Sequence, residues 1–189
     1  MQLSVGPYLV TGATGFVGSA VVRALVARGA DVRVLVRPGS DRRNLAGLEV
    51  AVFEGDLMRP ETLKSALEGC EGLFHVAADY RLWTRDPEAM FRANVEGSRA
   101  ILRSAHQSGV KRAVYTSSVA VLGIDPSGAP SDEQTPVRYA DMIGAYKQSK
   151  YRAEEAVNEV IRETGFDCVI VNPSSSPGSS VHDPSPLST

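Results

Sequence analysis

Short apolar runs alternate with longer amphipathic stretches along most of the chain. The short runs are rich in β-branched residues and predict strands, whereas the stretches between them carry apolar residues at helical spacing. We expect strands over residues 8–11, 32–36, 50–54, 72–76, 112–116 and 167–171. We expect helices over residues 16–28, 60–67, 87–107 and 143–164. A glycine closes each helical pattern, at Gly29, Gly69, Gly109 and Gly165.

This alternation is typical of a parallel sheet with helices on both faces. Six strands with helical crossovers predict an α/β fold of the Rossmann type, a doubly wound sheet with strand order 3-2-1-4-5-6. We expect this domain to span residues 1–171 and the polar stretch 123–138 to be a connection within it. The composition changes abruptly at residues 172–189, which are rich in Ser and Pro. Such a segment cannot bury a core, so we expect an irregular tail.

Composition narrows the classes of partner. The chain has 189 residues, of which 43% are hydrophobic, and a net charge of -2, which gives no reason to expect nucleic acid or an anionic membrane. No apolar run approaches the ~18 residues that span a bilayer, and no signal-peptide pattern precedes the first strand, so we expect a cytoplasmic protein. The two cysteines are too few for a disulfide framework or a Cys-based zinc site, and no metal is predicted. Cys168 lies in an apolar strand and is expected to be a buried thiol.

The stretch "TGATGFVG", residues 11–18, places three glycines between the first strand and the first helix. Gly12 would make the tight turn, Gly15 would let a ligand approach the backbone, and Gly18 would let the helix lie close to the sheet. The helix start would also direct N–H groups and its positive dipole end at a pyrophosphate. The pattern predicts dinucleotide binding, with a purely structural turn as the alternative.

The residue that ends the second strand predicts which dinucleotide is bound. A carboxylate there would favour NAD(H), but the strand ends in Arg37, whose guanidinium suits a 2′-phosphate. We therefore expect NADP(H) in preference to NAD(H), with Arg42 and Arg43 as possible further contacts. The alternative is a solvated arginine in a basic loop.

Tyr146 and Lys150 are four residues apart on a predicted helix, so their side chains project from one face. An ammonium beside a phenol stabilises the phenolate, so Tyr146 could exchange a proton with a substrate hydroxyl or carbonyl. Thr116, Ser117 and Ser118 follow the fifth strand, at the edge where open parallel sheets bind ligands. A hydroxyl there could polarise the substrate oxygen. Without these hydroxyls the Tyr–Lys pair would favour a plain amphipathic surface.

The glycine triplet, "TSS" and Tyr-x-x-x-Lys, in this order, resemble the extended branch of the short-chain dehydrogenases/reductases, the NAD-dependent epimerase/dehydratase family. Phrases such as "HVAADYRLW" and "DMIGAYKQSKYRAEEAV" are similar to hopanoid-associated sugar epimerases and to dihydroflavonol 4-reductases. The resemblance implies that Ser118 is the catalytic hydroxyl, with Ser117 as the alternative. It also implies that Tyr146 is the acid/base and that Lys150 additionally binds the nicotinamide ribose.

The resemblance and the glycine turn together assign cofactor contacts to Gly12, Thr14, Gly15, Phe16, Val17, Gly18, Arg37, Asp56, Leu57, Ala77 and Lys150. A strand-end turn is the alternative for Asp56 and Leu57. His75 is expected to be a packed wall residue. Asn94 stands where extended members carry a helix asparagine, or is a plain surface residue. Tyr80 and Trp83 would border the substrate side, or form a surface loop.

The implied function is hydride transfer at a carbinol or carbonyl carbon of a small, nucleotide-sugar-like substrate by an NADP(H)-dependent oxidoreductase or epimerase. A dihydroflavonol-reductase-like reductase of ketones or aldehydes is the first alternative. In the family, the Asn-Pro-Ser turn found here at residues 172–174 leads into a C-terminal substrate domain, which we expect to be absent from this sequence. A truncated cofactor-binding domain without turnover is therefore the second alternative. A homodimer remains open.

Overall fold

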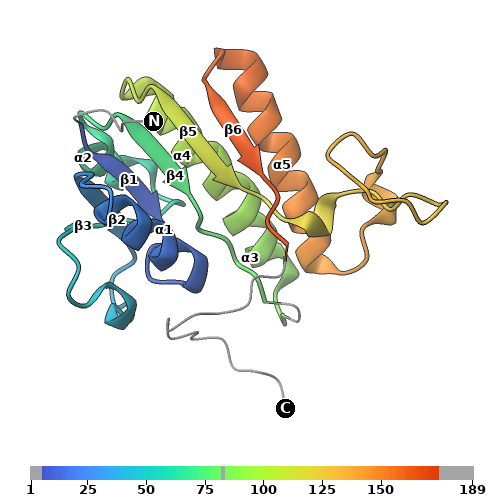
Figure 1. Cartoon of the computed structure of the whole chain (residues 1–189), viewed down its shortest axis with the longest axis horizontal. Coiled ribbons are helices and arrows are strands. Elements are labelled where there is room, and N and C mark those ends of the chain that lie inside the picture. Colours follow the sequence, from blue (N-terminus) through green and yellow to red (C-terminus); the bar gives the residue numbers. More distant parts are fainter. Residues whose placement is uncertain (1–5, 82–83, 175–189) are drawn as a thin grey trace.

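The structure, a computed structural model, describes residues 6–81 and 84–174, so the predicted tail beyond residue 174 and Trp83 lie outside it. One parallel sheet forms the centre, with the strand order β3-β2-β1-β4-β5-β6 that the sequence predicts (Figure 1). The strands are β1 (Tyr8–Thr11), β2 (Val32–Val36), β3 (Ala51–Glu54), β4 (Gly72–His75), β5 (Arg112–Thr116) and β6 (Cys168–Val171).

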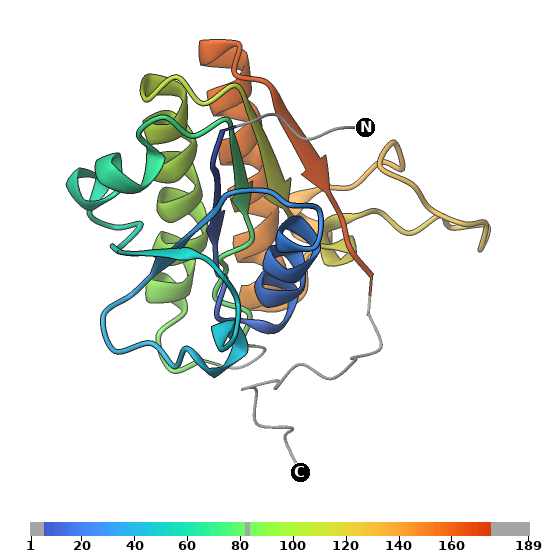
Figure 2. The same cartoon turned by 60° about the vertical axis from the view of Figure 1, so that its left-hand side comes forward.

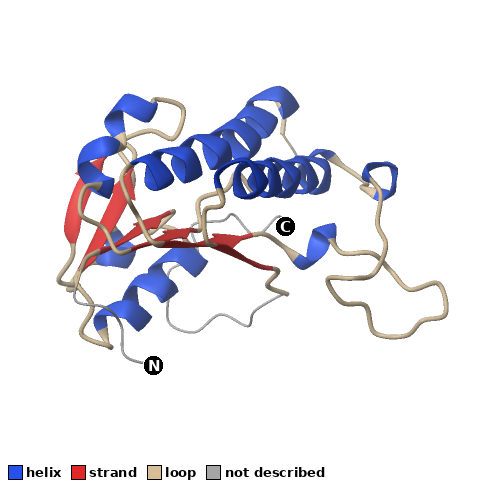
Figure 3. Cartoon of the chain, turned by 90° about the horizontal axis from the view of Figure 1, so that it is seen from above, coloured by secondary structure: helices blue, strands red, loops and turns tan. Residues whose placement is uncertain are grey.

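Helices cover both faces of this sheet, as expected. They are α1 (Phe16–Val26), α2 (Lys64–Leu67), α3 (Pro87–Phe91), α4 (Gly97–Gln107) and α5 (Ala145–Thr164). Figures 2 and 3 show α1 on one face, with α4 and α5 on the other. The stretch 123–138 contains no helix or strand and projects from the body as a loop. In the described part of the chain no helix is long and apolar enough to cross a membrane.

The central strand is buried from both sides, which explains its unbroken apolar run. Successive side chains of a strand point to opposite faces. Leu9 accordingly packs in the cluster formed with α2, α4 and α5, whereas Val10 packs in the cluster formed with α1. Both are fully buried. A strand with two covered faces needs apolar residues at every position.

The predicted helix over residues 87–107 is interrupted. It divides into α3, a π-helical segment Arg92–Glu96, and α4. Asn94 lies in this segment, where its Oδ1 accepts from the Asp79 N–H at 2.7 Å and its Nδ2 donates to the Asp79 carbonyl at 2.9 Å. A single widened turn shifts the apolar pattern by only one residue, so the sequence periodicity does not reveal it. The helix predicted over 60–67 likewise begins as a 3-10 turn, Pro60–Thr62.

Cys168 is only partly buried, so the prediction of a buried thiol is wrong for this residue. The reason is the position of β6, which is an edge strand of the described sheet. Its neighbours Val169 and Val171 are 45% and 39% exposed. Cys70, which lies between α2 and β4, is the buried cysteine.

The core contains one histidine, His75, held between two hydroxyl groups. Its Nδ1 lies 2.7 Å from Thr11 Oγ1, and its Nε2 lies 2.9 Å from Ser98 Oγ. Burial, reinforced by the charge of Lys150, lowers the pKa of His75 from 6.5 to about 3. His75 is therefore neutral over the physiological range, and it is a packed residue as the sequence predicts.

The pKa of His75 makes the stability of the fold depend on pH. As pH falls below about 6.5 the unfolded chain protonates this histidine while the folded chain does not, so stability is lost. We expect this group alone to lower the free energy of unfolding by up to ~1.4 kcal/mol per pH unit between about pH 6 and pH 4.5. Urea unfolding at several pH values measures this slope.

His75→Gln, which keeps a donor and an acceptor, should be less stable at neutral pH but should lose that part of the slope. His106→Gln, at an exposed position, is the control and should retain it. A slope that is identical in all three proteins would contradict the burial of a neutral His75.

Candidate functional site

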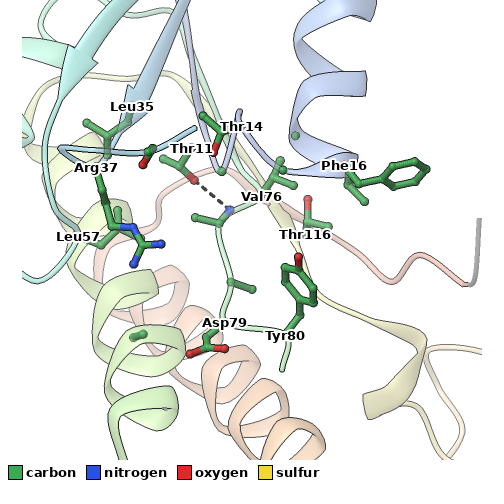
Figure 4. A pocket seen from close by; sticks show the side chains of 18 of the residues that line it. Thr11, Thr14, Phe16, Leu35, Arg37, Leu57, Val76, Asp79, Tyr80 and Thr116 are labelled. Atoms are coloured by element: carbon green, nitrogen blue, oxygen red, sulfur yellow. Dashed lines mark hydrogen bonds between the residues drawn. The ribbon is translucent and has the colours of Figure 1, made fainter. Parts of the chain in front are cut away.

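A cleft of about 1390 Å³ opens at the carboxyl edge of the sheet, among the loops that follow β1, β2, β4 and β5 (Figure 4). The structure brings to this one cleft the residues that were assigned a cofactor contact or a catalytic role: Gly12, Thr14, Gly15, Phe16, Val17, Gly18, Arg37, Asp56, Leu57, Ala77, Ser118, Tyr146 and Lys150. Their individual roles stay predictions.

Two of the three glycines are required by the packing of the chain itself. Gly12 has a φ of +68°, and a Cβ there would lie 2.7 Å from the backbone nitrogen of Ala77. A Cβ on Gly18 would lie 2.0 Å from the Gly12 carbonyl oxygen. The glycine turn therefore packs tightly against the loop after β4 and against the first turn of α1.

The glycine turn is also braced from outside by Asn44, a residue that the sequence analysis missed. The Asn44 side-chain Nδ2 donates to the Thr14 carbonyl at 2.9 Å. The backbone carbonyl of Asn44 accepts from the Arg23 guanidinium at 2.9 Å. Asn44 is only 6% exposed. One asparagine in a polar stretch makes no pattern, so only the fold reveals its role.

The three arginines considered for phosphate binding lie differently. Arg37 lines the cleft (Figure 4) and forms no ion pair with any described residue, although its charge helps to lower the pKa of the Asp79 carboxyl. Arg43 also lines the cleft but is paired with Asp41 at 2.6 Å. Arg42 pairs with Glu54 and does not line the cleft. The structure thus brings Arg37 and Arg43 to the site, but not Arg42.

Asp56 and Leu57 have structural tasks at the end of β3. The Asp56 carboxylate accepts from the Met58 N–H at 2.9 Å, which closes the turn. Leu57 packs against α4, where a Cβ on Gly97 would lie 3.2 Å from the Leu57 Cβ. Asp56 and Leu57 also line the cleft, so their place in a strand-end turn does not prevent the predicted contact with a cofactor.

The two serines after β5 are distinguished by their partners. The Ser117 hydroxyl donates to Glu154 Oε2 at 2.5 Å. Ser118 Oγ instead accepts from the Ala120 N–H at 3.1 Å, which leaves its own proton available to the cleft. The geometry therefore favours Ser118 over Ser117 as a donor to a substrate oxygen.

Lys150 is a charged residue that is almost completely buried, with only 2% of its surface exposed. Its Nζ donates to the Tyr115 hydroxyl and to the Thr116 carbonyl, each at 3.0 Å. Burial lowers the pKa of Lys150 to about 8, although the Glu154 carboxylate opposes this shift. Tyr146 lies one helical turn earlier on α5 and lines the same cleft.

The loop after β4 forms another wall of the cleft, and it contains Asp79, a residue that the sequence analysis did not single out. Asp79 lines the cleft and pairs with Arg81, and this guanidinium holds the pKa of the Asp79 carboxyl below its usual range.

Asn94, which fixes the Asp79 backbone, is 2% exposed and also donates to Ser149 Oγ. The plain surface alternative for Asn94 is therefore wrong. Tyr80 borders the cleft and is half exposed.

No group of His, Cys, Asp or Glu side chains within residues 6–81 and 84–174 could hold a metal ion.

Known proteins are similar to this chain in sequence and in fold. A protein named "Putative dihydroflavonol 4-reductase" from Synechocystis is 49% identical to 88% of this chain. The crystal structure of gox2253 is 56% identical, with a TM-score of 0.84 over 88% of the chain. The UDP-glucose 4-epimerase of Thermus thermophilus, solved in complex with NAD, is 28% identical, with a TM-score of 0.75 over 88% of the chain.

The chain spans about half the length of these proteins, namely 48%, 50% and 54% of them. The model of the NAD dependent epimerase/dehydratase family matches residues 8–188, which is nearly the whole sequence. The chain belongs to the NAD dependent epimerase/dehydratase family.

Proposed function

We propose that this chain carries the NADP(H) site and the catalytic groups of a reductase or epimerase that acts on a carbinol or carbonyl carbon. The observation that carries the proposal is that Ser118, Tyr146 and Lys150 line the same cleft as the glycine turn. Membership of a family that binds NAD(P) supports it. Open parallel sheets bind ligands at this edge.

The fit of a dinucleotide is supported by Gly15. A Cβ on Gly15 would meet only the Gly12 carbonyl, at 3.4 Å, and the φ of Gly15 is -82°, which any residue adopts. The packing of the chain therefore does not require glycine there, whereas a phosphate lying against the backbone would. Gly15 caps α1, which has no acidic residue in its first turn to repel an anion.

The catalytic groups have complementary tasks. Ser118 would donate a hydrogen bond to the substrate oxygen, and the Tyr146 phenol would give that oxygen a proton during reduction or take one during oxidation. When bound in the cleft, the nicotinamide would supply or accept the hydride at the carbon. The buried Lys150 ammonium would stabilise negative charge that develops on Tyr146.

The preference for NADP(H) is supported by the charges at the end of β2. Arg37 forms no ion pair with any described residue, and the nearby Asp79 carboxylate is itself paired with Arg81, so the Arg37 guanidinium is available to a phosphate. Arg43 adds a second positive charge at the cleft, although it is partly neutralised by Asp41.

Net reduction is the better supported of the two reaction types. The relative named as a dihydroflavonol 4-reductase is 49% identical, whereas the UDP-glucose 4-epimerase structure is 28% identical. Both reaction types use the same three catalytic groups, so the substrate and not the catalytic trio distinguishes them. We therefore propose NADPH-dependent reduction of a ketone or aldehyde.

The glycines give the first test. Gly15→Ala should leave the free energy of unfolding within about 1 kcal/mol of the parent and weaken NADPH binding by about tenfold or more. Gly18→Ala forces a Cβ onto backbone, so it should destabilise the fold by roughly 1–3 kcal/mol. Urea unfolding and NADPH fluorescence titration measure the two effects. Parental NADPH affinity in Gly15→Ala would show that the turn is purely structural.

Arg37→Asp tests the choice of cofactor. It replaces a partner for the 2′-phosphate with an acceptor for a ribose hydroxyl, and a charge-assisted bond contributes roughly 1.5–3 kcal/mol. We expect NADPH to bind about tenfold more weakly or worse, with NADH binding unchanged or improved. Arg42→Asp makes the same change of charge outside the cleft and serves as the control. An unaltered NADPH to NADH ratio for Arg37→Asp would refute the assignment.

Tyr146→Phe tests the chemistry. NADPH affinity should stay near the parental value while turnover falls by about 10² or more, because the phenol exchanges a proton and does not hold the dinucleotide. The assay uses NADPH with a panel of ketones, aldehydes and nucleotide sugars. If the parent chain bound NADPH but turned over none of them, the catalytic part of the proposal would fail and the cofactor part would stand.

A further inference from the structure

A row of buried polar side chains runs from the cleft into the interior, and the proposed mechanism uses only its first member. Lys150 Nζ donates to the Tyr115 hydroxyl at 3.0 Å, and the Ser98 side chain lies next to this phenol. Ser98 Oγ lies 2.9 Å from His75 Nε2, and His75 Nδ1 lies 2.7 Å from Thr11 Oγ1. Each of these five residues is at most 2% exposed. The row joins α5, β5, α4, β4 and β1.

A protonated Lys150 only donates, so the Tyr115 oxygen accepts from it. Ser98 lies between this phenol and His75 Nε2. In a neutral imidazole one ring nitrogen donates and the other accepts, so His75 can bond to Ser98 and to Thr11 at the same time.

At its far end the row reaches the cofactor side of the cleft. Thr11 Oγ1 also accepts from the Ala77 N–H at 3.2 Å, the bond drawn in Figure 4. Thr11 is the last residue of β1, directly before the glycine turn, and it lines the cleft. The two ends of the row therefore lie on the catalytic and the dinucleotide sides of one cleft.

We propose that Tyr115 is a positioning residue: its phenol, oriented by Ser98 and His75, holds the Lys150 ammonium in its charged form with one N–H directed at the cleft. The proposal rests on the proposed role of Lys150 as the cation beside Tyr146. Tyr115 itself does not line the cleft and touches no substrate.

Because Lys150 is buried, its hydrogen bond to Tyr115 strongly affects whether the ammonium stays charged. A buried ammonium loses its hydration and needs compensation from the protein. Two acceptors, Tyr115 Oη and the Thr116 carbonyl, take two of its three protons. The Tyr115 ring face lies 4.8 Å from Nζ, and Glu154 supplies the nearby negative charge. The other titratable groups that face this row are His75, Tyr146 and Cys168, and none of them adds negative charge while neutral.

Because burial brings the pKa of Lys150 to about 8, the loss of one acceptor changes its charge near neutral pH. Tyr115→Phe keeps the ring and removes only the phenol oxygen. We expect the pKa of Lys150 to fall by about one unit, a tenfold loss of proton affinity. A residue that merely filled space would leave this pKa unchanged.

The measurement is an NMR titration of ¹³C-labelled lysine side chains in the full 189-residue chain without cofactor. The sequence has four lysines, Lys64, Lys111, Lys147 and Lys150, and only the last is buried. Its signal is assigned by its loss in Lys150→Ala. Tyr151→Phe, which removes a phenol one residue further along α5, is the matched control and should leave the titration unchanged.

Ser98→Ala provides an independent variant should Tyr115→Phe not fold. It keeps the phenol but removes the group that orients it, so we expect a smaller fall of the Lys150 pKa in the same direction. A Lys150 titration in either folded variant that coincides with the parent would overturn the proposal. This outcome is independent of NADPH binding and turnover, whose absence in the parent would instead overturn the proposed function.

If the parent is active, the pH dependence of kcat/KM gives a second readout. Activity requires protonated Lys150 and should be lost as pH rises through its pKa. In Tyr115→Phe this alkaline limb should move to lower pH by about one unit, so the loss relative to the parent grows with pH. A loss that is the same at all pH values would indicate general damage and contradict the proposal.

Discussion

The parallel pairing of β1 with both β2 and β4 is the constraint on which the cleft depends. Thr11 is in register with Leu35 on one side and with His75 on the other. Since all three strands run the same way, the loops that follow them leave from one edge. The glycine turn, Arg37 and Ala77 consequently become neighbours although they are far apart in sequence. The contact of Gly12 with the Ala77 backbone leaves no space for a side chain at Gly12.

The second organising feature is a charge held inside the protein. Lys150 lies at the wall of the cleft and is buried because it packs against Tyr115 and Thr116 of β5. The surrounding structure compensates for this charge with two hydrogen bonds from β5, and no ion pair of Lys150 is formed among the described residues. Within the described residues no buried side-chain nitrogen or oxygen lacks a hydrogen-bond partner. A complete polar network of this kind rigidifies the region that surrounds it.

Much of the fold and of the cleft can be predicted from local sequence. The strands at residues 8–11, 32–36 and 112–116 are apolar runs with clear ends, and the glycine triplet marks the turn after the first of them. Other features depend on distant partners and have no local pattern. Three examples are the hydrogen bond of Ser117 to Glu154, the widened turn around Asn94 and the partial exposure of Cys168. Each is decided by which element packs alongside, which only the tertiary structure shows.

The turn that carries Ser118 is held by the last strand of the described sheet. The Ser117 N–H donates to the Val171 carbonyl at 2.8 Å, and the Val119 N–H donates to the Pro173 carbonyl at 3.1 Å. Asn172 Nδ2 adds a bond to the Ser118 carbonyl, 54 residues away in sequence. During synthesis the chain emerges from its N-terminus, and domains fold as it lengthens. The half of the cleft that holds the glycine turn is thus encoded in the part made first, whereas the serine turn lacks these three bonds on the ribosome until residues 171–173 have emerged.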